Sequence, residues 1–291
     1  RITSTDPSYL MPSPASHLGV LNKDEIALLT KWIKQGARYE KHWAFISPSK
    51  TPLPEIKEEK WARNEIDYFV ASKLQSLHLK HNEEAGKETL LKRLAFDLTG
   101  LPPDLQLQNE FIADKSEAAY EKTLDKLLAT PQFGEKMAIY WLDISRYADS
   151  YGYQDDDYRS QWPYRDWVIH AFNTNMPYDK FLTWQLAGDM LPDAGKEQVL
   201  ATAFLRNHKI TEEGGVIPEE YRVEYAIDKV KTYSRSILAL TAECAQCHDH
   251  KYDPISQKDY YRLFAFFNTS KEKGLEGLVG SGPAKTPVLK L

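Results

Sequence analysis

Residues 218–248 read PEEYRVEYAIDKVKTYSRSILALTAECAQCH, and this stretch decides both the type of fold and the position of the most specific motif. Pro218 suits the first turn of a helix, where its missing N–H costs nothing. Glu219 and Glu220 place negative charge at the positive end of the helix dipole. The sequence therefore predicts a long helix that begins at Pro218 and runs toward Cys247.

The end of this stretch continues the helical spacing. Apolar or small side chains recur at intervals of three and four residues, at Ile237, Leu240, Thr241, Cys244 and His248. Such spacing puts side chains on one face of a helix, so Cys244 and His248 are expected one turn apart. We therefore expect the two cysteines at the end of an amphipathic helix.

The five residues 244–248 have the pattern Cys-x-x-Cys-His, which is used to attach a c-type haem. Two thiols must each meet a vinyl group while an imidazole approaches the iron from the same short segment. Cys244 and Cys247 are thus the expected thioether positions, and His248 is the expected proximal ligand of the iron. On a continuing helix His250 would point roughly 200° away from His248, so we interpret it, with Asp249, as support for His248 rather than as a ligand.

Other uses of the cysteine pair are weighed against haem. A thioredoxin-like pair begins a helix after a strand, whereas here a helical pattern comes first. A closed zinc site draws its ligands from two separated pairs, and the chain has no second pair of cysteines. A disulfide or an inert pair remains the main alternative.

The second axial ligand of such a haem is a separate question. His208 is the first candidate, because it lies in a predicted loop before the long helix and near Gly214 and Gly215, which would let the backbone approach a bulky ring. Met190 and His170 come next. A methionine ligand would raise the reduction potential, and an empty position would admit small ligands, so this choice separates an electron carrier from an enzyme.

An acidic loop offers a possible calcium site. Asp149, Asp155 and Asp157 supply oxygen ligands, but their spacing lacks the regular register of an EF-hand loop. The alternative is a solvated acidic turn in which Asp149 pairs with Arg146 or Arg165.

Helix signals dominate the rest of the chain and strand-like alternation is almost absent, which predicts an all-α, multi-helix domain with long loops. Asn22 followed by Glu25 is a capping box, and Ser256 with Asp259 is another. The other predicted helices lie at 61–77, 87–98, 103–113, 117–129, 131–148, 163–174, 178–188 and 196–206.

Composition limits the possible partners. The chain has 291 residues, of which 42% are hydrophobic, enough for one or two cores, and no apolar run of about 18 residues predicts a membrane span. Its 37 basic and 42 acidic residues are interspersed and give a net charge of −5. Without a basic stripe, nucleic acid is not an expected partner.

Several long blocks resemble a known family. LLKRLAFDLTGLPP (90–103), WPYRDWVIHAFNTNMPYDKF (162–181) and CAQCHDHKYDPISQKDYYRLFAFF (244–267) are similar to successive parts of the second, cytochrome-like domain of the Planctomycete-type cytochrome c proteins. Residues 1–42 resemble the C-terminal end of the first cytochrome c module of these proteins.

The resemblance implies three regions: the end of a cytochrome c-like module (1–42), the helical domain with the cysteine motif (43–273) and a linker to a further region (274–291). It also implies that Met11 either is the distal ligand of a haem outside this chain or has no role as a ligand. Arg1 in place of an initiator Met fits the expectation that the chain is a piece of a longer protein.

The expected function is electron transfer by an extracytoplasmic haem c domain, in the periplasm or at the cell surface, within a larger modular protein. The resemblance associates such proteins with polysaccharide utilisation. Expected partners are a redox partner protein or other domains of the same polypeptide. Two alternatives stay open: a non-redox structural or carbohydrate-associated module whose cysteines form a disulfide, and a haem or metal enzyme that acts on polymers.

Overall fold

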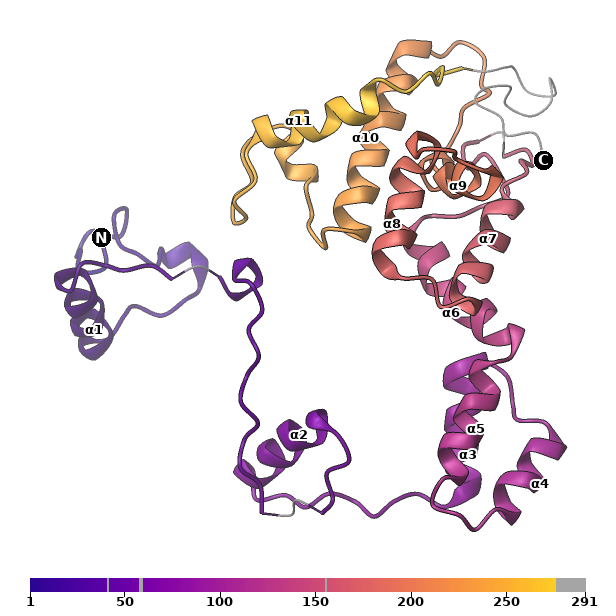
Figure 1. The fold of residues 1–291 in the computed structure, drawn as a ribbon. Coiled ribbons are helices and arrows are strands. Elements are labelled where there is room, and N and C mark those ends of the chain that lie inside the picture. Colours follow the sequence, from indigo (N-terminus) through magenta and orange to yellow (C-terminus); the bar gives the residue numbers. More distant parts are fainter. Residues whose placement is uncertain (41, 58–59, 155, 276–291) are drawn as a thin grey trace. The chain divides into compact units, whose positions relative to one another are not determined.

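The computed structural model describes residues 1–40, 42–57, 60–154 and 156–275 (Figure 1). Within these residues the secondary structure consists of helices, with two isolated β-bridges and no β-strand. The predicted all-α fold is therefore confirmed. The chain divides into two compact units, Arg1–Glu83 and Glu84–Leu291. The predicted boundary at residue 42 separates two sequence modules and not two compact units, so it stays a prediction. The predicted linker, 274–291, lies outside the described residues except for residues 274 and 275.

In its described residues the first unit contains two α-helices, α1 (Lys23–Lys34) and α2 (Glu65–Ser76), and two short 3₁₀ helices, η1 (Pro14–Ser16) and η2 (Trp43–Phe45). The predicted capping box at the start of α1 is present, because Asn22 accepts hydrogen bonds from the first turn and its own N–H donates to Glu25 Oε2 at 2.7 Å. Neither α1 nor α2 buries a side chain.

The second unit contains nine α-helices and three 3₁₀ helices within the described residues. They are α3 (Lys87–Thr99), α4 (Leu105–Ala113), α5 (Ala119–Leu128), α6 (Pro131–Ile144), α7 (Trp162–Asn173), α8 (Tyr178–Ala187), η3 (Gly188–Met190), α9 (Lys196–Ala201), η4 (Thr202–Arg206), α10 (Pro218–Ser236), η5 (Glu243–Gln246) and α11 (Gln257–Asn268). The predicted bounds of α3, α7 and α8 agree with the structure to within one residue.

The predicted helix from Pro218 to Cys247 is wrong beyond Ser236. α10 ends at Ser236, and Ala239 has φ = 53°, in the left-handed region. A right-handed helix cannot continue through such a residue. Leu240 N then donates to Ser234 O at 2.9 Å, so the chain turns back before η5 begins at Glu243.

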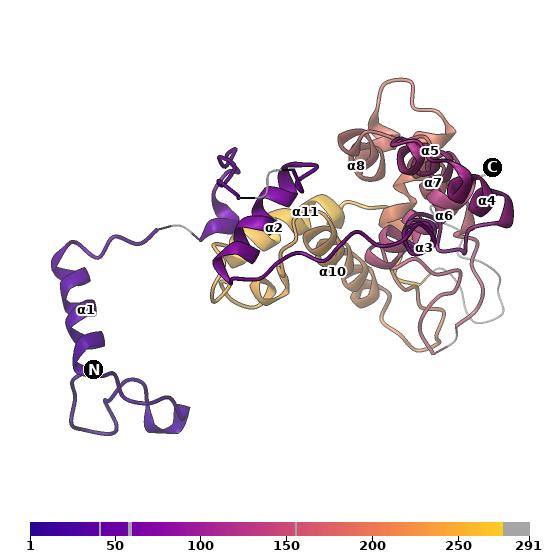
Figure 2. The same ribbon diagram turned by 90° about the horizontal axis from the view of Figure 1, so that it is seen from below.

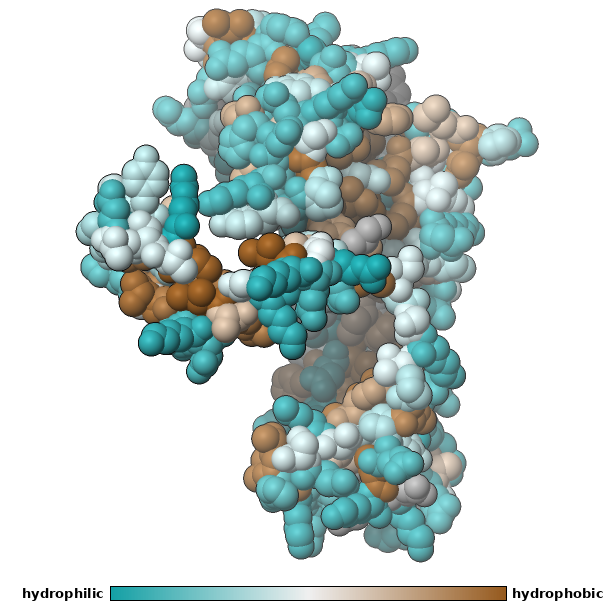
Figure 3. All heavy atoms as spheres, turned by 90° about the vertical axis from the view of Figure 1, so that its left-hand side faces the viewer, coloured by the Kyte–Doolittle hydropathy of each residue, from teal (hydrophilic) through white to brown (hydrophobic). Residues whose placement is uncertain are grey.

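Three clusters of buried side chains form the core of the second unit. The first joins α6, α7, α8, α9 and η4, and the second joins α3, α4 and α5. In the first cluster Gln185 is 1% exposed, and its Oε1 accepts from Trp141 Nε1 at 2.7 Å and from the Tyr164 hydroxyl at 2.6 Å. Large apolar side chains also remain on the surface, visible as brown areas in Figure 3.

The third cluster positions the cysteine motif. It consists of Ala226 and Val230 from α10, Ala242 and Ala245 around η5, and Tyr260 and Phe267 from α11. α10 and α11 lie side by side in both ribbon views (Figures 1 and 2). The short η5 helix is therefore packed against two longer helices.

Candidate functional site

The Cys-x-x-Cys-His segment lies on η5 and the turn that follows it. Cys244 and Cys247 are both free thiols and both exposed, whereas Ala245 between them is 0% exposed. His248 N donates to Cys244 O at 3.4 Å, which closes one turn. The tight turn thus buries Ala245 in the third cluster and leaves both sulfur atoms at the surface.

Side chains of α11 hold the backbone of this segment. Gln257 Nε2 and the Tyr261 hydroxyl each donate to Gln246 O, both at 3.1 Å. On the other side, Glu243 forms an ion pair with Arg235 at the end of α10. These contacts fix the position of the motif even though its functional side chains are exposed.

In the two histidines of the segment, the Nδ1 atoms have different hydrogen-bonding roles: Nδ1 of His248 donates and Nδ1 of His250 accepts. His248 Nδ1 lies 2.8 Å from Asp249 O, a group that can only accept, so Nδ1 carries the proton and Nε2 keeps its lone pair. His250 Nδ1 accepts from the N–H of Asp253 at 2.8 Å, so its proton is on Nε2. Of the two rings, His248 has the tautomer that a metal ligand through Nε2 requires.

The group that orients the His248 ring belongs to the backbone and not to a side chain. The sequence points to the side chain of Asp249 or His250, but the group at His248 Nδ1 is the carbonyl oxygen of Asp249. The Asp249 carboxylate instead accepts from Gln257 N at 2.7 Å, at the start of α11.

His208 lies in the predicted loop before α10 but is deeply buried, with a side-chain exposure of 1%. Its ring stacks on Tyr225, with 4.5 Å between centroids. Nδ1 lies 2.7 Å from Lys209 O, and Nε2 lies 3.1 Å from Glu272 Oε1. Burial lowers the pKa of His208, although the contact with Glu272 opposes this shift. Both ring nitrogens therefore already have partners.

The other candidate axial ligands lie in different surroundings. Met190, at the end of η3, is 80% exposed, and His170 is exposed in the last turn of α7. Met11 belongs to the first unit and is 42% exposed. Their roles as ligands stay predictions.

Asp149 is fully engaged by its own loop. Its carboxylate accepts from Gln161 N at 2.9 Å and from the Tyr147 hydroxyl, and burial together with this bond raises the pKa of Tyr147. The suggested pairing with Arg146 or Arg165 is not found, because Arg146 pairs with Asp228 and Arg165 with Asp166.

The calcium prediction has no geometric support among the described residues, which contain no group of three or more His, Cys, Asp or Glu side chains able to hold a metal ion. Asp157 contributes its backbone oxygen to a hydrogen bond from Tyr151 N at 3.0 Å. Asp155 lies outside the described residues. The calcium site stays a prediction.

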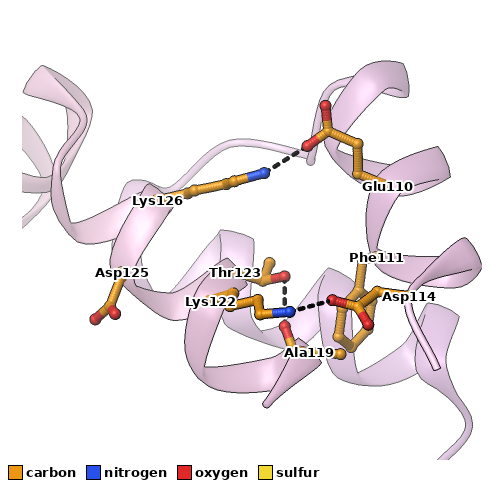
Figure 4. Close-up of a pocket in the computed structure, with 8 residues that line it drawn as sticks. All are labelled: Glu110, Phe111, Asp114, Ala119, Lys122, Thr123, Asp125 and Lys126. Atoms are coloured by element: carbon orange, nitrogen blue, oxygen red, sulfur yellow. Dashed lines mark hydrogen bonds and ion pairs between the residues drawn. The ribbon is translucent and has the colours of Figure 1, made fainter. Parts of the chain in front are cut away.

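A pocket between α4 and α5 has polar walls that pair with each other (Figure 4). Lys126 Nζ lies 2.5 Å from Glu110 Oε2, and Lys122 Nζ lies 3.0 Å from Asp114 Oδ2. This pocket contains none of the residues that the sequence marks as functional.

Sequence reasoning missed one group of residues, the buried contacts around Glu272. Arg206, His208 and Lys229 all reach its carboxylate. These residues are separated by 43 to 66 positions along the chain, so no local pattern signals their meeting.

Comparison with known proteins gives one family. The family described as PSCyt2, protein of unknown function (DUF1549), matches residues 65–272, the greater part of the chain. No curated protein and no solved structure matches. Among the described helices, none is both long enough and apolar enough to cross a membrane.

Proposed function

We propose, from the premise that the chain belongs to the PSCyt2 family, that residues 244–248 attach a c-type haem and that the domain transfers electrons. Its partners would be a redox protein or other domains of a larger polypeptide. Covalent haem attachment of this type takes place outside the cytoplasm, so the proposal includes a periplasmic or cell-surface location.

The side chains of Cys244, Cys247 and His248 fit the attachment of a haem c. Two free thiols stand three residues apart at the surface, and neither is engaged in a disulfide. The neighbouring His248 has its Nδ1 proton directed at a backbone oxygen and its Nε2 lone pair available for a metal. This tautomer is the single observation that carries the proposal.

The haem, when bound, would supply a one-electron couple at its iron. Cys244 and Cys247 would hold the porphyrin, and His248 would bind the iron. The Asp249 carbonyl would keep the imidazole in one orientation. Cys244, Cys247 and His248 are exposed, so these side chains could hold the haem at the surface of the domain.

The sixth ligand is the open part of the proposal. His208 stays the first prediction, but its Nε2 faces Glu272 Oε1 in a site that is 1% exposed. Iron binding by His208 would therefore require this contact to break. A low-spin spectrum that is lost in a His208→Ala protein with unchanged haem content would support ligation by His208.

The test is to produce the chain in a host that attaches haem c outside the cytoplasm, and to measure its visible spectrum and its mass under denaturing conditions. We expect a Soret band and a pigment that stays with the denatured polypeptide. The Cys244→Ala and Cys247→Ala proteins should each lose one thioether, and the double variant should lose covalent haem.

The chain offers a matched control for the iron ligand. His248→Ala should abolish the native spectrum, whereas His250→Ala, two residues away but with the opposite tautomer, should keep it. A colourless wild-type protein with a Cys244–Cys247 disulfide would instead favour the structural or carbohydrate-associated module. Spectral shifts with cyanide or peroxide would favour the enzyme.

A further inference from the structure

The last described residues, 269–275, cross the first turns of α10 as a segment that we call the strap. Gly274 O accepts from the Tyr225 hydroxyl at 2.9 Å. A Cβ atom on Gly274 would lie only 1.6 Å from Pro218 O. The strap backbone is thus in direct contact with α10, at a position that only glycine permits.

The strap buries a charge instead of an apolar side chain. Its residues alternate, with Lys271 and Lys273 exposed and Glu272 and Gly274 buried. A segment that serves only as a cover usually anchors itself with hydrophobic side chains. Here the deepest side chain is a carboxylate, so the strap depends on contacts that a dissolved anion can also make.

The carboxylate of Glu272 is fully coordinated. Arg206 Nη1 lies 2.5 Å and His208 Nε2 lies 3.1 Å from Oε1, while Lys229 Nζ pairs with Oε2. Ser270 Oγ also donates to Oε2 at 3.3 Å. The side chains of His208, Lys229 and Glu272 are 1%, 3% and 4% exposed, so the Lys229–Glu272 ion pair and the His208 ring beside it lie away from water.

Three of the four donors, Arg206, His208 and Lys229, lie outside the strap. Other parts of the fold hold these three side chains in place. Arg206 ends η4, and Lys229 lies in the middle of α10. The ring of His208 is held by stacking on Tyr225 and by Lys209 O. A guanidinium, an ammonium and an imidazole that converge on one point form a typical receptor for an oxyanion.

We propose that Arg206, His208 and Lys229 form a carboxylate-binding site and that Glu272 is its built-in ligand. Withdrawal of the strap would open the site to the carboxylate of another molecule. The site lies outside residues 244–248, and it is an alternative to iron ligation by His208, because both uses need His208 Nε2.

The test uses the full-length Glu272→Ala protein, with sodium acetate as the probe and sodium chloride at the same pH and ionic strength as the reference. Acetate at about ten times its Kd should raise the Tm of this protein by about 3–6 °C over chloride, with saturation. The wild-type protein should show no such difference, because Glu272 fills the site.

Two further variants test whether the rise of Tm in acetate comes from the proposed site. Adding Lys229→Met to Glu272→Ala should abolish the acetate effect. Glu243→Ala is the matched control, because Glu243 is a half-buried carboxylate with a single cationic partner, Arg235, and should gain no saturable response. Equal Tm values of Glu272→Ala in acetate and chloride would overturn the proposal. If Glu272→Ala does not fold in chloride, recovery of its helical circular dichroism in acetate supports the site, and failure in both salts overturns it.

Discussion

His248 and His250 stand two residues apart, and hydrogen bonds to the backbone give them different chemistry. The carbonyl of Asp249 fixes the proton of His248 on Nδ1, while the N–H of Asp253 takes the lone pair of His250 Nδ1. The cysteine spacing alone already favoured His248 as the ligand. The tautomers were not predictable, because they depend on the turn between η5 and α11.

A buried polar residue of the first cluster gives a stability prediction. Gln185→Leu removes the acceptor shared by the Trp141 indole and the Tyr164 hydroxyl. The indole then keeps only its 3.1 Å bond to the Tyr164 oxygen, and the buried Tyr164 hydroxyl loses the acceptor for its own proton. We expect a loss of about 1–3 kcal/mol in the free energy of unfolding, measured with urea. Gln106→Leu, at an exposed position whose amide bonds only Glu110, should change it by less than about 0.5 kcal/mol. Similar losses in both proteins would contradict this account.

Glu272 predicts a pH dependence of stability. Its pKa is lowered in the folded protein, since the contacts of His208, Lys229 and Arg206 outweigh the cost of burial. A lowered pKa gives stability that is present above the usual glutamate pKa of about 4.3 and is lost as the pH falls further. At pH 7, Glu272→Gln should be less stable than wild type by about 3–5 kcal/mol.

This difference should shrink as the pH falls below about 4.3, because the unfolded wild-type chain then binds a proton at Glu272 that the folded protein does not. Urea unfolding of both proteins from pH 7 to pH 3 measures it. A difference that stays constant over this range would show that the charge of Glu272 does not stabilise the fold.

At the scale of elements, helix starts were more predictable than helix ends. The capping boxes at Asn22 and Ser256 are local, because the cap and its partner lie three residues apart, and both are present in the structure. The end of α10 has no such signal. Alanine is the best helix former, so Ala239 gave no reason to expect φ = 53°.

The left-handed residue Ala239 gives the prediction at this scale. Ala239→Gly relieves the steric cost of the conformation and should leave the free energy of unfolding unchanged or raise it by about 0.5 kcal/mol. The same substitution at Ala71, inside α2, should locally cost about 1 kcal/mol of helix stability. Chemical denaturation, followed by circular dichroism, compares the two. A loss of about 1 kcal/mol at Ala239 would mean that the helix continues there in solution.

At the scale of the whole molecule, the two units differ in how much they bury. α1 and α2 of the first unit have no buried side chain, whereas α7 buries Tyr164, Trp167, Val168 and Ala171. Backbone hydrogen bonds without a packed core open at little cost in free energy.

Amide hydrogen exchange should therefore distinguish the units. We expect the amides of α1 and α2 to exchange orders of magnitude faster than those of α7, as measured by mass spectrometry of peptides from the intact protein. Equal protection of α1 and α7 would indicate that another surface covers α1 in solution.

The sequence by itself determined the all-α class, most helix positions and the cysteine–histidine motif, because each depends on residues within a few positions of one another. Tertiary structure alone decided where α10 ends and which side of η5 faces the core. It alone also brought Arg206, His208 and Lys229 to Glu272. The contacts at Glu272 join residues more than 40 positions apart, and polar side chains on separate segments carry no periodic signal of the partner they will meet.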